Sequence, residues 1–423
     1  MLKQYSVDKF INEYANVDNV AGIKVQESVS KICQEVKISK DKALIKFTKM
    51  FDKVDLKEIE VSRFEIEKAY NSVDKDWLDA LKKAKKNIEE FHKKQLENSW
   101  FDTSNGVIRG ELVRPIEKVG IYVPGGTASY PSSVLMNAIP AKVAGVNQIF
   151  MTTPPKKDGL IPKETLAAAY LSGVDKIYKI GGAQAIAALA YGTESVTKVD
   201  KIVGPGNVYV TEAKRYVYGN VGIDMLAGPS EVCVLANETT NSAYAASDLL
   251  AQAEHDPLAR VILIATNQSI VDKINHQISK QLNKLPRKNI ASQSITNGAY
   301  VIVDDFIQAA KLINTLAPEH LEIAIDNPFD FLDYIENAGS IFLGHFAAES
   351  LGDYFAGVNH VLPTSQTARF TSSLSVRDFY TVSGVLYYTK QALQSCSDDV
   401  ILLAEKEGLT GHANAIRERM RNE

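Results

Sequence analysis

The sequence predicts an α/β protein built from two consecutive three-layer α/β/α domains. From about residue 119, short apolar runs alternate with longer segments of helical periodicity, and the runs fall into two series. A turn-rich stretch at Ala227–Ser230 separates the two series. Alternating strands and helices predict parallel sheets covered by helices on both faces. With 423 residues, the chain is also too long for one ordinary core.

The individual elements follow from this alternation. Residues before about 110 are read as helical, because apolar residues recur at helical spacing from Leu78 to Phe91 among lysines and glutamates. Roughly the last 35 residues are expected to return to helix. The expected strands are Val119–Val123, Gln148–Thr153, Lys176–Ile180 and Lys201–Val203 in the first series, and Glu231–Ala236, Val261–Ala265, Ala299–Val303, Leu321–Ile325 and Ser340–Leu343 in the second. Helices are expected between them, among others at Ser133–Ala144, Ala183–Tyr191 and Ala243–Glu254.

These elements suggest four consecutive parts. They are a helical N-terminal extension at residues 1–115, able in part to pack with the second α/β domain, α/β domains at 116–229 and 230–375, and a helical C-terminal tail at 376–423.

The composition excludes several classes of protein. The chain is 45% hydrophobic and 23% charged, as in ordinary soluble proteins, and its net charge of -4 argues against nucleic acid as a partner. No stretch approaches the roughly 20 apolar residues of a membrane span, and no signal peptide is seen. The three cysteines, Cys33, Cys233 and Cys396, form neither a disulfide framework nor a CxxC clip, so we expect a cytoplasmic protein.

Four of the seven histidines, namely His255, His320, His360 and His412, have a carboxylate at close spacing. In a chain poor in histidine, this grouping is typical of a metal site with acid/base groups beside it, and it favours an enzyme over a binding module. The other reading is a set of histidines that simply satisfy helix ends and turns.

Gln252 and His255 lie three residues apart at the end of an expected helix, so they share one face. Together they could bind one cation, and Asp353 and His412 could complete the set. A mixed nitrogen and oxygen set without cysteine suits Zn²⁺ or Mn²⁺.

Glu319 and His320 place an acid beside an imidazole. An imidazole can transfer protons near neutral pH, and a carboxylate can activate water. The pair precedes its strand, however, whereas ligand sites in open α/β sheets prefer the carboxyl ends. A histidine that caps a helix C-terminus is the alternative. His92 and His276 lie on charged helix faces and are expected to be solvated.

Three glycine-rich turns could bring backbone N–H groups close to a phosphate: Pro124–Gly126, Gly181–Gly182 and Gly204–Asn207. No GxGxxG follows a strand, so a dinucleotide is only one option, and tight structural turns are the other. Ser230 lacks the Gly-x-Ser-x-Gly surroundings of a nucleophile, which favours a substrate contact or a turn.

Taken together, the motifs resemble those of the histidinol dehydrogenase family. The resemblance spans about Val119 to Arg417 and rests on several specific segments. They are Tyr122–Gly126, Pro131–Asn137, Gly181–Ile186, Val203–Asn207, Ala227–Glu231, Ala251–Asp256, Glu319–Leu321, Gly352–Tyr354, Asn359–Thr364, Glu407–Leu409 and Gly411–Ala413.

The resemblance implies two Rossmann-like domains of the aldehyde-dehydrogenase type. It also implies oxidation of L-histidinol to L-histidine through L-histidinaldehyde with two NAD, the final step of histidine biosynthesis. One zinc ion per subunit would be held by Gln252, His255, Asp353 and His412.

The same resemblance assigns the remaining roles. His320 would be the base and Glu319 the group that activates water. Ser230, His360 and Glu407 would contact substrate together with His320 and the metal ligands, and Tyr122, Gln184 and Asn207 would contact NAD. The family is a homodimer with shared active sites, so Glu407 and His412 would come from the other subunit. A zinc-dependent hydrolase of an amide or ester and a metal-dependent binding protein are the rival readings.

Overall fold

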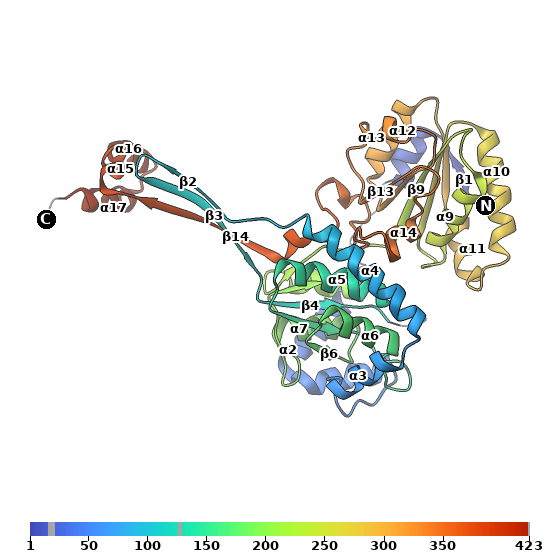
Figure 1. Cartoon of the computed structure of the whole chain (residues 1–423), viewed down its shortest axis with the longest axis horizontal. Helices are drawn as coiled ribbons and strands as arrows, with labels where there is room; N and C mark the ends of the chain where they lie inside the picture. Colours follow the sequence, from blue (N-terminus) through green and yellow to red (C-terminus); the bar gives the residue numbers. More distant parts are fainter. Residues whose placement is uncertain (16–21, 126–128, 422–423) are drawn as a thin grey trace. The chain divides into compact units, whose positions relative to one another are not determined.

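The computed structural model describes residues 1–15, 22–125 and 129–421, so the expected turn residue Gly126 lies outside the described part. The chain divides into two compact units. One comprises Met1–Gln95 and Ile116–Phe379, and the other comprises Leu96–Pro115 and Tyr380–Glu423. The first unit contains two parallel sheets flanked by helices, which confirms the predicted α/β fold class (Figure 1).

The first sheet has five parallel strands in the order β6-β5-β4-β7-β8. Its strands are β4 (Lys118–Tyr122), β5 (Gln148–Thr152), β6 (Lys176–Tyr178), β7 (Lys201–Val203) and β8 (Gly222–Ile223). Strands β4 and β7 are neighbours although β5 and β6 lie between them in sequence. The strand order therefore reverses beside β4, and ligands of open α/β sheets bind at the carboxyl ends of such a pair.

Helices cover both faces of this sheet. Helices α7 (Gly182–Tyr191) and α8 (Val208–Val217) share a core with α2 (Ile23–Phe51). Helices α5 (Pro131–Ala144) and α6 (Lys163–Ser172) follow β4 and β5, and α3 (Arg63–Ser72) and α4 (Lys75–Lys93) pack against them. Helix α7 is apolar almost all round, because it is buried between the sheet and α2.

The second sheet has six parallel strands in the order β1-β11-β10-β9-β12-β13. They are β1 (Lys3–Tyr5), β9 (Glu231–Ala236), β10 (Arg260–Ala265), β11 (Ala299–Ile302), β12 (His320–Ile323) and β13 (Ser340–Leu343). The core on one face includes α9 (Ser242–Ala253), α10 (Gln268–Leu282) and α11 (Lys288–Asn297). On the other face lie α12 (Phe306–Leu316), α13 (Phe329–Leu332) and the segment Phe10–Ala15, which follows the short α1 (Val7–Lys9).

The start of the chain thus belongs to the second sheet. Strand β1 pairs in parallel with β11 along its whole length. Short helix α14 (Glu349–Tyr354) follows β13 and contacts α9.

The second unit combines a three-stranded antiparallel sheet with three helices. The elements are β2 (Trp100–Ser104), β3 (Val107–Pro115), β14 (Tyr380–Tyr388), α15 (Lys390–Gln394), α16 (Ser397–Lys406) and α17 (Thr410–Met420). Strand β3 lies between β14 and β2. All five residues of β2 and most of β14 are exposed.

Two expectations for the N-terminal region are wrong in detail. Helix extends only to Lys93, and residues 100–115 form β2 and β3 around Asn105 and Gly106, which both have positive φ. Such an Asn-Gly pair is typical of a tight hairpin turn. His92 is fully buried rather than solvated, because α4 packs that part of its surface inward. His276 is exposed, as expected.

No helix in the described part of the chain is long and apolar enough to cross a membrane.

Candidate functional site

The first candidate region lies at the carboxyl ends of β4 and β7. Tyr122 ends β4, and the turn Gly204–Asn207 follows β7. Gly204 has φ +115°, and a Cβ atom there would lie 2.2 Å from the carbonyl oxygen of Tyr122. Only glycine therefore allows the turn to pass so close to the neighbouring strand. Asn207 caps α8 by accepting hydrogen bonds from the backbone N–H groups of Tyr209 (3.0 Å) and Val210 (3.2 Å).

A buried ion pair holds this turn. Lys214 and Asp224 pair with each other, with side chains only 2% and 1% exposed. Nζ of Lys214 also donates to the carbonyl oxygen of Gly204 (3.0 Å), and the N–H of Gly204 donates to Asp224 Oδ2 (2.8 Å). Both backbone polar groups of the glycine thus bond to charged side chains, and such hydrogen bonds are stronger than those between neutral groups.

Tyr122 and Gln184 both border Gly182, at the start of α7. The N–H of Gly182 donates to the hydroxyl oxygen of Tyr122 (3.1 Å). Burial raises the pKa of Tyr122 to about 12, so its hydroxyl stays protonated at neutral pH. Gln184 is 1% exposed, and its Oε1 has no hydrogen-bond partner in the described part of the chain. The three residues expected to contact NAD thus all lie in segments at the carboxyl ends of β4, β6 and β7.

The second candidate region lies at the amino ends of strands in the other sheet. Ser230 immediately precedes β9, and Glu319 immediately precedes β12, which begins at His320. Because β9 and β12 are adjacent, with His320 opposite Val232, these polar residues meet at one edge of the sheet.

His320 has a defined tautomer. Its Nδ1 lies 3.1 Å from the backbone carbonyl oxygen of Glu231, which can only accept, so Nδ1 carries the hydrogen. Nε2 is buried and has no hydrogen-bond partner among the described residues. Burial lowers the pKa of His320 to about 4, and the imidazole is therefore neutral near pH 7. An unprotonated, unpaired Nε2 is suited to accept a proton.

Glu319 is 6% exposed and accepts the N–H of Glu231 at Oε2 (2.8 Å). Burial raises the pKa of this carboxyl well above its usual value, and the nearby carboxylates of Glu231 and Asp353 raise it further. A carboxylate with a raised pKa is a stronger base, as activation of water requires.

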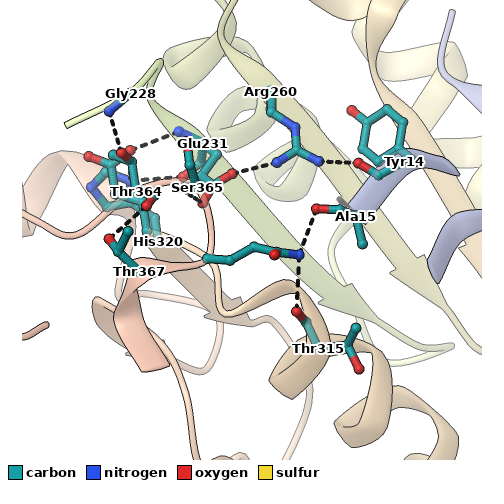
Figure 2. Close-up of polar contacts among 12 residues, drawn as sticks. Tyr14, Ala15, Gly228, Glu231, Arg260, Thr315, His320, Thr364, Ser365 and Thr367 are labelled. Atoms are coloured by element: carbon teal, nitrogen blue, oxygen red, sulfur yellow. Dashed lines mark hydrogen bonds and ion pairs between the residues drawn. The ribbon is translucent and has the colours of Figure 1, made fainter. Parts of the chain in front are cut away.

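Glu231 contacts both His320 and Glu319. Figure 2 shows Glu231 together with His320, Ser365 and Arg260. The side chain of Glu231 is completely buried, pairs with Nη1 of Arg260 (2.9 Å) and accepts the N–H of Ser365 (3.0 Å). Nη2 of Arg260 in turn donates to the carbonyl oxygen of Tyr14 (2.7 Å). The backbone of Glu231, which bonds both His320 and Glu319, is therefore tied to the second sheet and to the start of the chain.

A possible metal centre lies beside His320. One donor atom each from His255, Glu349 and Asp353 lies within 4.8 Å of the others. Gln252 is fully buried near the end of α9, and one end of its side-chain amide lies 2.9 Å from Glu349 Oε1. The nitrogen and oxygen donors, together with two carboxylates, fit a divalent cation such as Zn²⁺.

His360 lies next to this centre. Its Nδ1 is 3.0 Å from the carbonyl oxygen of Asp353, and its Nε2 is 3.2 Å from Oγ of Ser133 on α5. The carbonyl only accepts, so Nδ1 donates and the Ser133 hydroxyl donates to Nε2. Burial lowers the pKa of His360, in agreement with a neutral ring.

Glu407 and His412 belong to the second unit. Glu407 follows α16 and His412 lies on α17, and both are exposed. The first unit therefore brings together Gln252, His255, Asp353, Glu319, His320 and His360, without Glu407 and His412.

Three residues to which the sequence reasoning gave no role belong to this region: Glu231, Arg260 and Glu349. Two of them, Glu231 and Arg260, could have been noticed in the sequence. Each is a charged residue that begins an otherwise apolar strand, and the two lie directly opposite each other. Glu349 lies four residues before Asp353 on α14, and residues at this spacing share a helix face.

The chain is similar over nearly its whole length to proteins of one family. The family model of histidinol dehydrogenase matches residues 16–420. Histidinol dehydrogenase from Clostridium acetobutylicum is 54% identical over 98% of this chain and 96% of its own length, and that from Bacillus cereus is 55% identical over 98% and 96%.

A solved structure is also similar. The crystal structure of histidinol dehydrogenase from Elizabethkingia anophelis is 41% identical, with a TM-score of 0.94, and the match covers 99% of this chain and 98% of that one. The chain therefore belongs to the histidinol dehydrogenase family and is an oxidoreductase that acts on an alcohol and an aldehyde.

Proposed function

We propose that the chain oxidises L-histidinol to L-histidine through L-histidinaldehyde, with zinc and two NAD, as the last step of histidine biosynthesis. The family supports the reaction. The observation that carries the chemistry is Nε2 of His320, which has no hydrogen-bond partner among the described residues; Nδ1 of the same ring lies 4.0 Å from Glu349 of the metal cluster. A proton acceptor thus lies next to a place where a cation can hold a substrate.

One zinc ion per subunit is proposed to be held by Gln252, His255 and Asp353, with the partner subunit's His412 as a further ligand. The support is the donor chemistry of the cluster and the absence of cysteine among its members. When bound, zinc would act mainly as a template that orients the substrate.

In the first oxidation, Nε2 of His320 would take the hydroxyl proton while the carbinol hydrogen leaves as hydride to the first NAD⁺. Glu319, once deprotonated, would take a proton from water, whose oxygen attacks the aldehyde carbon. The resulting hydrate would lose a second hydride to the second NAD⁺ and yield the carboxylate. General acid–base steps of this kind contribute about 10²–10⁴-fold each.

NAD is proposed to lie at the carboxyl ends of β4, β6 and β7, against Tyr122, Gln184 and Asn207. The position beside a reversal of strand order supports this placement. Ser230, His360 and the partner subunit's Glu407 are proposed as substrate contacts, together with Gln252, His255, His320, Asp353 and His412.

We also propose a cytoplasmic homodimer with shared active sites. The second unit exposes Trp100, Phe101, Leu386 and Leu403, which would suit burial against a second copy. The three cysteines are free thiols, as a reducing compartment requires. We keep the division of the chain into four parts that end at residues 115, 229, 375 and 423 as part of this proposal. In it, residues 116–229 form the NAD-binding domain.

An absorbance assay for NADH tests the function. The zinc-loaded protein should form two NADH per histidinol consumed, and a substrate-free sample should form none. No NADH with zinc, NAD⁺ and histidinol present would overturn the proposal. Release of acid from amide or ester substrates without NAD⁺ would instead support a hydrolase.

A further inference from the structure

A buried ion pair lies beside the two proposed catalytic residues, and the proposed function gives it no role. Glu231 begins β9 and Arg260 begins β10, and the two residues lie directly opposite each other. Oε2 of Glu231 lies 2.9 Å from Nη1 of Arg260, and the two side chains are 0% and 13% exposed. Because desolvation offsets most of the attraction in such a pair, stability alone does not account for it.

One member of the pair, Glu231, holds both catalytic side chains through its backbone. The N–H of Glu231 donates to Oε2 of Glu319 (2.8 Å), and its carbonyl oxygen accepts the hydrogen on Nδ1 of His320 (3.1 Å). Any shift of the backbone at residue 231 therefore moves the proposed base and the proposed water-activating carboxylate together. A displacement of about 1 Å at such groups can lower a rate by about 10²-fold.

The side chain of Glu231 anchors this backbone. Its Oε1 accepts the N–H of Ser365 (3.0 Å), while its Oε2 pairs with Arg260. Burial raises the pKa of Glu231, whereas the charge of Arg260 and the hydrogen bonds to the carboxylate lower it. Without the guanidinium, the carboxyl would take up a proton or turn toward water, because an unpaired buried charge is costly. Arg260 therefore keeps both acceptor oxygens of Glu231 directed at their donors.

Arg260 is itself fixed by the start of the chain. Its Nη2 donates to the carbonyl oxygen of Tyr14 (2.7 Å), and its guanidinium lies over the Tyr14 ring, 4.8 Å from the centroid (Figure 2). The next carbonyl oxygen, that of Ala15, accepts a hydrogen bond from Nε2 of Gln366 (2.7 Å). The planar fork of a guanidinium can bond Glu231 and Tyr14 at once, whereas the ammonium group of a lysine is a point charge without this fork.

We infer that Arg260 is a positioning residue for the reaction: through Glu231, it sets the placement of the two proposed catalytic side chains. It acts through the residue opposite it on the neighbouring strand rather than on the reacting atoms. The inference rests on the roles proposed for His320 and Glu319 and adds a residue to them. It also gives the first residues of the chain a part in supporting the site, because Tyr14 holds the guanidinium.

Single-turnover kinetics of the zinc-loaded protein, with enzyme in excess over histidinol and NAD⁺ saturating, test the inference. The amplitude of NADH formation reports how much protein is folded and active, whereas the rate constant of each oxidation reports the reaction in those molecules. A purely structural role would lower the amplitude alone. The variants are Arg260→Met, Arg260→Lys and Glu231→Gln, and L-histidinaldehyde supplied separately isolates the second oxidation.

Arg63→Met is the matched control. Arg63 also pairs with a glutamate, Glu67 (2.8 Å), and also lies over a tyrosine ring, that of Tyr170, but it belongs to α3. Metal analysis and the steady-state KM for histidinol are measured for every variant.

We expect Arg260→Met to slow both oxidations by about 10-fold or more, with zinc content unchanged and the KM for histidinol altered less than kcat. Arg260→Lys should recover part of the loss, since it keeps a positive charge beside Glu231. Arg63→Met should match the wild type. In a Glu231→Gln background, Arg260→Met should add little, because the group on which Arg260 acts is already changed.

Wild-type rate constants in Arg260→Met, or a lower amplitude with unchanged rate constants, would overturn the inference and leave the dehydrogenase function intact. Slowing of only one oxidation would also overturn it, because Glu231 holds both side chains. If Arg260→Met does not fold, Arg260→Lys decides: rate constants below those of the wild type support the inference, and unchanged ones overturn it. A wild type that forms no NADH would refute the proposed function itself, and with it the roles on which the inference rests.

Discussion

Nδ1 of His320 donates to the backbone carbonyl oxygen of Glu231, 3.1 Å away, and this bond decides which imidazole nitrogen can act as a base. The acceptor belongs to the backbone, so no side-chain rotation can remove it. Nε2 is left with its lone pair and without a partner in the described part of the chain. The fold thus fixes the tautomer before any substrate arrives.

Replacement of His320 by Asn should slow hydride transfer by about 10²–10⁴-fold at neutral pH, because the proton acceptor is lost. Zinc content should stay at the wild-type value. Single-turnover NADH formation and metal analysis measure the two effects. His276→Asn, on an exposed face of α10, is the control. An unchanged single-turnover rate would remove His320 from the role of base.

Sharing of the active site between subunits predicts complementation. His255→Asn and His412→Asn homodimers should each have little activity, whereas mixed dimers should recover part of it. In a mixed dimer, one of the two sites has both histidines intact. Tagging the two variants differently allows mixed dimers to be purified and assayed for NADH. Confirmed mixed dimers without recovered activity would contradict a shared site.

Gly204→Ala should weaken NAD binding more than Gly219→Ala, although both glycines have positive φ (+115° and +95°). An alanine in left-handed backbone costs about 1–2 kcal/mol at either position. Only at Gly204 does the added Cβ also meet backbone, 2.2 Å from the carbonyl oxygen of Tyr122; nothing lies within 4 Å at Gly219. Urea unfolding and NAD titration separate stability from binding. Equal NAD affinities for the two variants would argue against the Gly204 turn as part of the NAD site.

Protein stability should depend on pH through His92. Its Nδ1 lies 2.7 Å from Gln95 Oε1, its Nε2 lies 3.3 Å from Nδ2 of Asn359, and burial lowers its pKa below 6.5. In the unfolded chain, His92 therefore takes up a proton near pH 6.5, whereas in the folded chain it stays neutral at that pH. The free energy of unfolding should fall as the pH drops below 6.5, by up to about 1.4 kcal/mol per pH unit from this group.

The matching variant is His92→Gln, which cannot titrate in this range. Compared between pH 7 and pH 5.5 by urea unfolding, it should lose less stability than the wild type. The other histidines are present in both proteins and cancel in the difference. An identical pH dependence would show that His92 does not contribute.

Nine of the eleven strands of the two parallel sheets could be predicted from sequence, because a strand buried on both faces is a continuous apolar run; the short β1 and β8 were not predicted. The Asn105-Gly106 hairpin was missed, since the exposed strands around it carry no such run. The pairing of β1 with β11 could not be predicted from the sequence either. Three residues at the start of the chain have no local feature that identifies a partner near residue 300.

In the candidate site, too, some features could be predicted from the sequence and others could not. Acids and histidines adjacent in sequence, such as Glu319 and His320, could be identified because they share a segment. The burial of His92 could have been predicted, because His92 lies four residues after Ile88 and continues the buried face of α4. The approach of Glu349 to Gln252, in contrast, depends on the contact between α14 and α9 and is not indicated by local spacing.

The place of β1 at the edge of the second sheet has a consequence for synthesis of the protein. The ribosome delivers Lys3–Tyr5 before the first sheet, but their hydrogen-bonding partner, β11, emerges only after that entire sheet has been made. Likewise, the carbonyl oxygen of Tyr14 can accept its hydrogen bond from Arg260 only after Arg260 has been synthesised. Strand β1 must therefore wait for its partner while a complete α/β sheet forms after it, and closure of the second sheet is a late event.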